Sequence, residues 1–212
     1  MAQASLAALR LYGVAAVENG QAASLVDGTS LVHFRAIAAI VEPANYSAQP
    51  LGEDDTQRYL EVLEEAHSSA AILPAPPGTV FQSQNTLMRW LELHYFTLTE
   101  ALAVVEGHSA ARVSITTKPG QEDGEAGRSL AALAADTLRS LRSQAAATVT
   151  LPKADADDEE GVVARASFLV DSQRWESFKD TVNKEAQRHP ALSFRVTGPW
   201  PPYDFVRMQF GG

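Results

Sequence analysis

The segment Gly198-Pro199-Trp200-Pro201-Pro202-Tyr203-Asp204-Phe205-Val206 is the most constrained part of this 212-residue chain. Each proline fixes its own φ near about −65° and pushes the residue before it towards an extended conformation. Gly198 can adopt backbone angles that are closed to other residues. We therefore expect a stiff corner that ends one strand, fixes the rings of Trp200 and Tyr203, and leads into a last strand from about Tyr203 to Phe210.

The rings of Trp200 and Tyr203 have two interpretations. Large aromatic side chains usually close a hydrophobic core, and this is one interpretation. In the other, one ring stays partly exposed and contacts a partner protein. Neither interpretation gives the corner any catalytic chemistry.

The composition narrows the class of protein. The chain has 17 Lys and Arg against 26 Asp and Glu, a formal net charge of −9, and no cysteine. Disulfides, thiol nucleophiles and thiolate metal sites are thereby excluded, and binding to a nucleic acid is disfavoured. The N-terminus lacks the pattern of a signal peptide, and no apolar run is long enough to span a membrane. We expect a soluble, cytoplasmic protein.

The first half predicts two or three strands and two helices, because the segments 31–35 and 37–41 can form one strand or two. The strands are expected at Leu9–Val17, Leu31–Arg35 and Ile37–Val41, the last of them stopped by Pro43. A helix should follow Gly52, with Asp55 or Thr56 as its cap, and Leu73–Phe81 should run extended.

A longer helix should begin after the cap residue Ser83 and end near Glu106. One side of it carries apolar residues and one histidine at helical spacing. Trp90 and Tyr95 broaden that side, so we expect a heavily buried helix. The residues of the side are Leu87, Leu91, His94, Leu98, Leu102 and Val105.

The second half alternates strands with helices. Strands are expected at Ala111–Thr116, Val162–Val170 and Leu192–Val196. One helix should follow a polar loop over residues 118–127, and another should begin at the cap residue Ser172. The acidic segment 153–161 does not fit the calcium-binding EF-hand pattern. Glu160 stands where that pattern requires Gly, and Ala166 stands where it requires the closing Glu. We interpret it as a solvated loop.

These patterns predict an α+β protein of two domains, residues 1–108 and 109–212, each with an antiparallel sheet backed by helices. The second domain, which contains the acidic loop 153–161, has the alternation of a ferredoxin-like unit.

The usual signatures of catalysis and cofactor binding are missing from the sequence. It has no phosphate-binding glycine loop, no dinucleotide fingerprint and no nucleophile elbow. The five histidines show no metal-ligand spacing. A Ser/His/Asp triad assembled from distant positions stays open, but nothing nominates its members. We expect no enzyme activity and no cofactor.

Four blocks of the sequence resemble the gas vesicle accessory proteins of the GvpF/GvpL family, in the order of that family. They are Leu11–Val14, Val32–Val41, the block formed by Leu73-Pro74 and Gly78–Phe81, and above all Gly198–Val206. One departure stands out: Ala75-Pro76-Pro77 replaces an arginine-containing tripeptide of the family. A charged contact made by that arginine in relatives cannot be made by the same residue here.

The resemblance implies a two-domain accessory protein of gas vesicle assembly that binds the hydrophobic shell protein and other accessory proteins. Such a protein would be associated with gas vesicles in the cytoplasm, in a nucleating or chaperone-like role. As partner-binding residues we expect Trp200, Tyr203, Phe205, Phe81 and Trp90. Two alternatives stay open: a ferredoxin-like module that binds a small ligand, and an enzyme whose site is assembled at long range.

Overall fold

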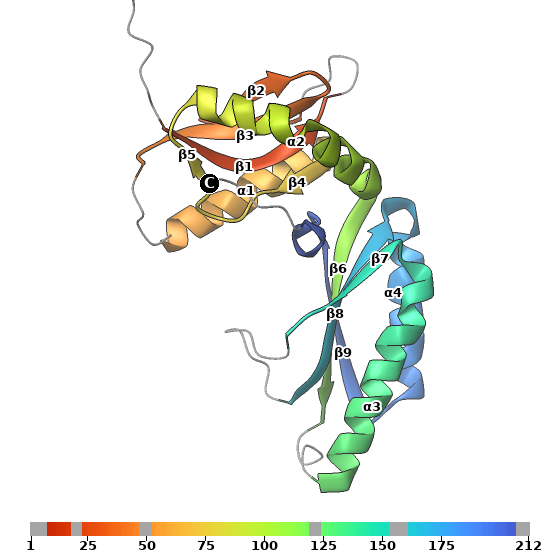
Figure 1. Cartoon of the computed structure of the whole chain (residues 1–212). Coiled ribbons are helices and arrows are strands. Elements are labelled where there is room, and N and C mark those ends of the chain that lie inside the picture. The colour runs from red at the N-terminus through yellow and green to blue at the C-terminus, as the bar shows by residue number, and fades with distance from the viewer. Residues whose placement is uncertain (1–7, 18–22, 47–51, 119–123, 153–160, 207–212) are drawn as a thin grey trace, which may run out of the picture. The chain divides into compact units, whose positions relative to one another are not determined.

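The computed structural model describes residues 8–17, 23–46, 52–118, 124–152 and 161–206 (Figure 1). The chain folds into two compact units. Unit 1 comprises the residues up to Glu106 together with those from Pro201 onward, and unit 2 comprises Gly107–Trp200. The chain therefore enters unit 2 directly after the long helix that ends the first part of unit 1, and it returns to unit 1 within the proline corner.

Unit 1 is built on a five-stranded antiparallel sheet. Its strands are β1 (Ala8–Ala16), β2 (Ser30–Phe34), β3 (Ile37–Ala44), β4 (Ile72–Pro74) and β5 (Val80–Phe81). The order is β2-β3-β1-β4, and β5 also pairs with β1. The segments predicted as strands before residue 45 do form strands, and the segments 31–35 and 37–41 form two separate strands instead of one. The expected extended segment 73–81 supplies β4 and β5, which pair with different parts of β1.

The prediction that Pro43 stops the third strand was wrong, since β3 continues to Ala44. Pro43 pairs with Leu9 of β1, whereas the pairing of β2 with β3 ends at Val41. One side of β3 is therefore unpaired at Pro43. A strand tolerates a proline there because no ladder hydrogen bond is lost.

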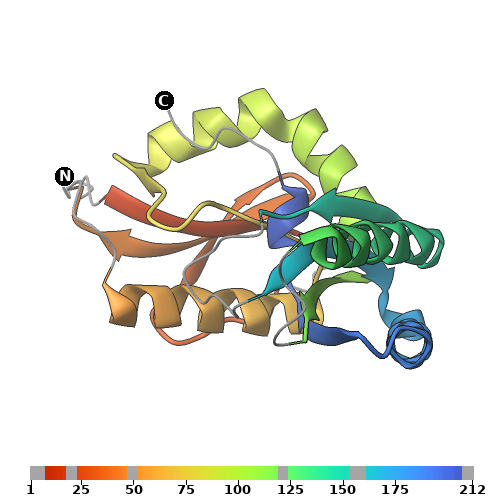
Figure 2. The ribbon, with the colours of Figure 1, turned by 90° about the horizontal axis from the view of Figure 1, so that it is seen from below.

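Two helices cover the sheet of unit 1. Helix α1 (Glu53–Ser69) lies against one face and α2 (Gln84–Val105) against the other, as Figure 2 shows. Helix α2 begins after the predicted cap Ser83, whose Oγ accepts a hydrogen bond from Thr86 N. The cap of α1 is Gly52, however, and not Asp55 or Thr56. The Asp55 carboxylate instead accepts a hydrogen bond from Gly52 N at 3.3 Å, as an acidic residue in the first helical turn can.

Unit 2 is a four-stranded antiparallel sheet with the order β7-β8-β6-β9. The elements follow the chain as β6 (His108–Thr117), α3 (Gly124–Leu141), β7 (Ala147–Thr150), β8 (Val162–Asp171), α4 (Trp175–Arg188) and β9 (Leu192–Trp200). Short 3₁₀ turns cover Arg142–Gln144 and Ser172–Arg174. This βαββαβ order is ferredoxin-like, as predicted.

Three details of unit 2 differ from the prediction. Helix α3 begins at Gly124, inside the expected loop 118–127. The turn before α4 is capped by Asp171 instead of Ser172, because its carboxylate accepts a hydrogen bond from Gln173 N at 2.8 Å. The short strand β7 was not predicted at all. The acidic residues 153–160 lie outside the described part of the chain.

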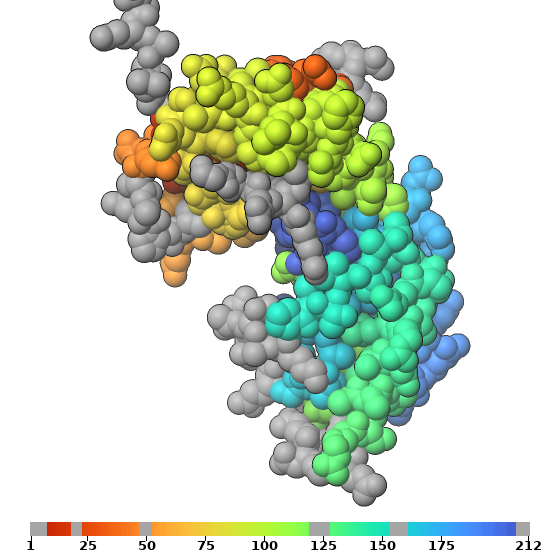
Figure 3. Space-filling model, viewed as in Figure 1, coloured from red at the N-terminus to blue at the C-terminus, as the bar shows by residue number. Residues whose placement is uncertain are grey.

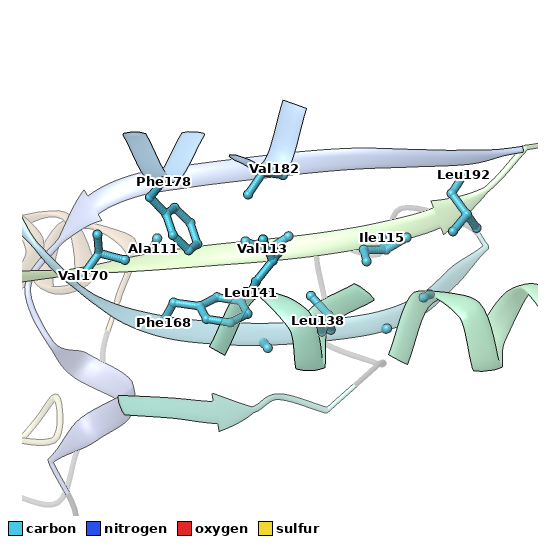
Figure 4. Packing of buried hydrophobic residues seen from close by; sticks show 13 residues of the cluster. Ala111, Val113, Ile115, Leu138, Leu141, Phe168, Val170, Phe178, Val182 and Leu192 are labelled. Carbon is cyan, nitrogen blue, oxygen red and sulfur yellow. The ribbon is translucent and has the colours of Figure 1, made fainter. Parts of the chain in front are cut away.

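Both helices of unit 2 pack on the same face of its sheet. The side chains that fill this interface come from β6, β8, β9, α3 and α4 (Figure 4). At its centre the rings of Phe168 and Phe178 lie 5.4 Å apart. This core is separate from that of unit 1, where Tyr12 and Tyr59 stack between β1 and α1.

The end of the chain also differs from the prediction. Strand β9 continues through Gly198 and Pro199 to Trp200, and Tyr203–Phe205 form a 3₁₀ turn where a strand was expected. The remaining residues of the expected strand, 207–210, lie outside the described part. The positive φ expected of Gly198 is confirmed, at 121°.

Candidate partner-binding surface

Helix α2 has a second apolar face that points away from its sheet. The buried face matches the predicted stripe except at His94, which is only half-buried, and it consists of Leu87, Trp90, Leu91, Leu98, Leu102 and Val105. On the other side, Leu93 is 79% exposed, Phe96 76% and Val104 58%. These three residues share one side of the helix, because their spacings of three and eight residues are close to whole turns.

The expectation that α2 is heavily buried is therefore wrong for this outward side. A surface helix normally turns charged and polar residues to solvent, so a leucine and a phenylalanine with three quarters of their area exposed are unusual. Helix α2 lies at the surface in the view of Figure 3. The only charged residue on this side between Phe96 and Val104 is Glu100.

An arginine and two aromatic rings form a line of contacts that ends at the exposed Phe96. Arg35, in the turn between β2 and β3, places its guanidinium carbon 5.3 Å from the ring centroid of Phe34 and 5.0 Å from that of Tyr95. The ring of Phe34 packs edge-on to Tyr95, and Tyr95 packs edge-on to Phe96, both at 5.7 Å. These distances are those of cation–π and aromatic contacts, so the cluster is a connected structure.

We call Leu93, Phe96 and Val104, together with Phe34, Arg35 and Tyr95, the α2 surface. Its composition of Arg, Tyr, Phe and Leu includes residue types that dominate the energy of protein interfaces. Sequence reasoning missed Leu93 and Phe96. The signal was their position, because both are large apolar residues of α2 outside the buried stripe. Arg35 gave no signal, because a left-handed φ of 55° is not expected of an arginine.

Two of the five predicted partner-binding residues lie beneath α2. Phe81 is 7% exposed and Trp90 9% exposed, and their ring centroids are 5.7 Å apart. The Trp90 ring also lies 5.0 Å from that of His94. Phe81 belongs to β5 and Trp90 to the buried face of α2, so this pair packs the helix against its sheet.

The other three predicted residues lie in the proline corner, and all are half-buried. Trp200 ends β9 in unit 2, and its Nε1 donates a hydrogen bond to Thr197 Oγ1 at 3.2 Å. Tyr203 and Phe205 belong to unit 1, where the Tyr203 ring lies 6.2 Å from that of Tyr59. Of the five predicted residues, Phe81 and Trp90 therefore contact each other. Tyr203 instead contacts Tyr59, which was not predicted.

The charged residues with shifted pKa values lie elsewhere in unit 1, between α1 and its sheet. Arg10 Nη1 donates to Asp55 Oδ1 at 2.6 Å, and this bond lowers the pKa of the Asp55 carboxyl. The hydroxyl of Tyr12 donates to Glu42 at 2.9 Å, and burial raises the pKa of Tyr12. These pairs join α1 and β3 to β1, which is a structural role.

The described residues offer no other obvious chemistry. They contain no group of three or more His, Cys, Asp or Glu side chains placed to hold a metal ion. No described helix combines the length and apolar character needed to cross a membrane.

Comparison with known proteins assigns the chain to a family. The family model of the gas vesicle synthesis protein GvpL/GvpF matches residues 8–129 and 118–207. Gas vesicle protein F1 of Halobacterium salinarum is 23% identical over 189 residues, 85% of this chain and 82% of the relative. Gas vesicle protein F of Haloferax mediterranei is 25% identical over 211 residues, 95% of both chains.

Two solved structures share the fold. The crystal structure of the gas vesicle protein GvpF from Anabaena sp. PCC7120 aligns with a TM-score of 0.78 at 16% identity, over 96% of this chain and 97% of that one. GvpF from Microcystis aeruginosa aligns with a TM-score of 0.71 at 15% identity, over 95% of this chain and 100% of that one. Because the family model matches residues of both units, the chain belongs to the GvpL/GvpF family of gas vesicle proteins.

Proposed function

We propose that this protein assists gas vesicle assembly by binding the hydrophobic shell protein, and other accessory proteins, through the α2 surface, and that it catalyses no reaction. Membership of the GvpL/GvpF family supports the role in gas vesicles. The observation that carries the binding role is the exposure of Leu93 and Phe96 on the outward side of α2. We place the protein in the cytoplasm, at the growing vesicle.

The physical basis is the apolar area of both partners. A shell subunit that has not yet assembled exposes apolar surface and strand edges, which promote aggregation. Covering a leucine or phenylalanine side chain stabilises a complex by roughly 1.5–3 kcal/mol for each residue fully buried. An acidic protein with a local apolar face can bind such a subunit and keep the complex dispersed, because its net charge opposes self-association.

The arginine–aromatic cluster gives the contact a defined geometry. Arg35 is held over the rings of Phe34 and Tyr95, so its guanidinium loses little freedom when a partner binds. The exposed Phe96 ring borders that cluster. Rigid aromatic and arginine side chains are the residues whose truncation costs most at protein interfaces.

The five residues predicted from the sequence keep a place in this proposal. Trp200, Tyr203 and Phe205 are half-buried and retain area that a second accessory protein or the shell protein can contact. Phe81 and Trp90 act indirectly, because their packed rings hold α2 in the orientation that exposes Leu93 and Phe96.

The test is capture of the co-expressed shell protein by a tagged copy of this chain. The double variant Leu93→Ser/Phe96→Ser should capture at least about tenfold less shell protein, since two interface side chains of this kind commonly contribute more than about 1.4 kcal/mol together. Its melting temperature should be unchanged, because substitutions at exposed positions alter stability by less than about 0.5 kcal/mol.

A matched control changes exposed polar residues of the same helix. Glu92→Gln/Thr97→Ser alters two exposed positions beside Leu93 and Phe96 and removes no more apolar area than one methyl group. This variant should capture the shell protein as well as the unchanged chain does. Equal capture by both variants, with both folds intact, would refute the α2 surface as the binding site.

A further inference from the structure

We propose that unit 2 contains a second binding site, for a small molecule with a carboxylate head and a short apolar tail. The site is a groove of about 320 Å³ between α3 and the edge strand β7, with β8 as its floor. We call it the α3–β7 groove. It lies in the described part of unit 2 and shares no residue with the α2 surface.

Small side chains create the room for this groove. Ala131 and Ala135 of α3 lie one helical turn apart and line it opposite Ala164 and Ala166 of β8. Elsewhere the same helix and strand fill their interface with larger side chains, including Leu141 and Phe168. The groove is open to solvent, since Ala131 is partly exposed and Ala135 exposed, and a ligand can enter it from this flank of α3.

The two ends of the groove differ in polarity. Alanine side chains, Leu151 and Val163 make most of its wall apolar. Arg139 and Arg142, near the C-terminal end of α3, lie on its rim, and Thr148 and Thr150 of β7 line the opposite side. Thr148 pairs with Phe168, and Thr150 with Ala166, so both threonines point to the helix-covered face of the sheet.

The arginines indicate the charge of the ligand. Arg139 forms an ion pair with Asp136, and the structure gives Arg142 no carboxylate partner among the described residues. In a chain with a net charge of −9, Arg142 therefore gives the apolar groove a local positive charge, whereas the charge of Arg139 is balanced by Asp136. Arg165 also borders the groove, but strand alternation points its side chain to the opposite face from Ala164 and Ala166, so we do not count its charge.

Size and polarity together define the class of ligand. A volume of 320 Å³ equals that of about ten water molecules, at roughly 30 Å³ each. A molecule of about ten heavy atoms therefore fills it, with its tail against the alanines and its carboxylate at Arg142. A guanidinium binds a carboxylate through two parallel hydrogen bonds, which favours an anionic head over an uncharged one.

Octanoate is the probe that tests this site, at concentrations below those at which it forms micelles. Titration of the whole protein, followed by amide chemical shifts, should move signals of residues 131–142, in α3 and the turn after it, and of β7. Octanol lacks the charge, and acetate lacks the tail. Each should bind at least about tenfold more weakly, the range expected when a charged hydrogen bond or the buried tail is lost.

Four variants test the proposal. Arg142→Gln should weaken octanoate binding about tenfold, whereas Arg128→Gln, which removes a charge from α3 outside the groove, should not. Ala131→Leu/Ala135→Leu should fill the groove and abolish binding. Leu93→Ser/Phe96→Ser should leave octanoate binding unchanged, which separates this site from the proposed shell-protein contact.

The proposal is overturned if octanol binds as tightly as octanoate, or if the groove-filling variant still binds with unchanged affinity. It is also overturned if octanoate at millimolar concentration shifts no signal of α3 or β7. Since no step depends on the α2 surface, loss of shell-protein capture in the α2 variants would leave this site unaffected.

Discussion

At the scale of single residues, Gly198 is a position in β9 where a side chain is poorly tolerated. Its φ is 121°, and a Cβ added there would lie 2.6 Å from the carbonyl oxygen of Ala110 and 2.9 Å from the Trp175 ring. Both a strained backbone and a clash with fixed backbone atoms would follow. The glycine in the proline corner thus permits β9 to lie close to β6 and to α4.

We predict that Gly198→Ala lowers the free energy of unfolding by about 2–4 kcal/mol, the combined cost of backbone strain and overpacking. Gly107→Ala is the matched control. It also has a positive φ, of 68°, but no atom lies within 4 Å of its added Cβ. Its cost should stay near about 1 kcal/mol, and urea unfolding measures both values. Equal losses in the two variants would show that the close approach at Gly198 is unimportant.

Asp55 provides a residue-scale prediction about pH. The hydrogen bond from Arg10, with a smaller contribution from the backbone of Gly52, lowers the pKa of Asp55 in the folded protein. A carboxyl whose folded pKa is depressed stabilises the fold above its unfolded pKa, and this stabilisation disappears as pH falls through the folded value. Asp55→Asn should therefore be less stable than the unchanged protein at pH 6, and the difference should shrink towards pH 3.

Urea unfolding at both pH values measures this change, and Asp54→Asn is the control. Asp54 lies in the same first turn of α1 and shares the electrostatic effect of the helix N-terminus, but the structure records no ion pair with Arg10 for it. If the two variants lose the same amount of stability at each pH, the pairing with Arg10 contributes nothing.

At the scale of elements, the two faces of α2 have different functions, and stability measurements can separate them. Trp90 packs on Phe81 in the core, whereas Phe96 is exposed. Trp90→Ala should lower the free energy of unfolding by about 3–5 kcal/mol, as expected for a buried tryptophan. Phe96→Ala should change it by less than about 0.5 kcal/mol. A large loss of stability in Phe96→Ala would show that the outward face of α2 is part of a core.

Elements with strong periodicity were predictable from the sequence. The alternation in β6 and the apolar stripe of α2 led to the observed strand and helix, because packing on one face imposes that period. The strand β7 was missed, since four residues at a sheet edge carry too little pattern. The predicted stop at Pro43 was wrong. Whether a strand tolerates a proline depends on which neighbouring strands pair with it at that position, and the sequence of the strand itself does not show this.

The candidate surface was less predictable than the fold. Sequence reasoning chose large aromatic residues, and Phe81 and Trp90 proved to be buried against each other. The exposed Leu93 and Phe96 belong to the same helix, but an apolar residue off the main stripe is equally consistent with a broader buried face. Only the position of the sheet decides between those outcomes. Arg35 depends on a turn conformation and on two rings from separate elements, which no local pattern encodes.

At the scale of the whole molecule, we propose that the two units are independently folding domains. Each has its own sheet and its own hydrophobic core. Residues 201–206 belong to unit 1, although the sequence analysis assigned them to the second domain. The ring of Tyr203 packs on Tyr59, and the hydroxyl of Tyr59 donates to the carbonyl oxygen of Ala75 at 2.6 Å within the same core. The first domain is thus closed by the last part of the chain.

Fragments of the chain test this division. A fragment of residues 107–200 contains all four strands and both helices of unit 2, so it should unfold cooperatively on heating and in urea. Extending it with residues 201–206 should not raise its stability, because the ring of Tyr203 packs on Tyr59 of unit 1. A fragment of residues 1–106 lacks Tyr203, and it should unfold at a lower urea concentration than unit 1 does in the whole chain. Non-cooperative melting of the fragment 107–200, or its stabilisation by residues 201–206, would mean that the two units form a single folding domain.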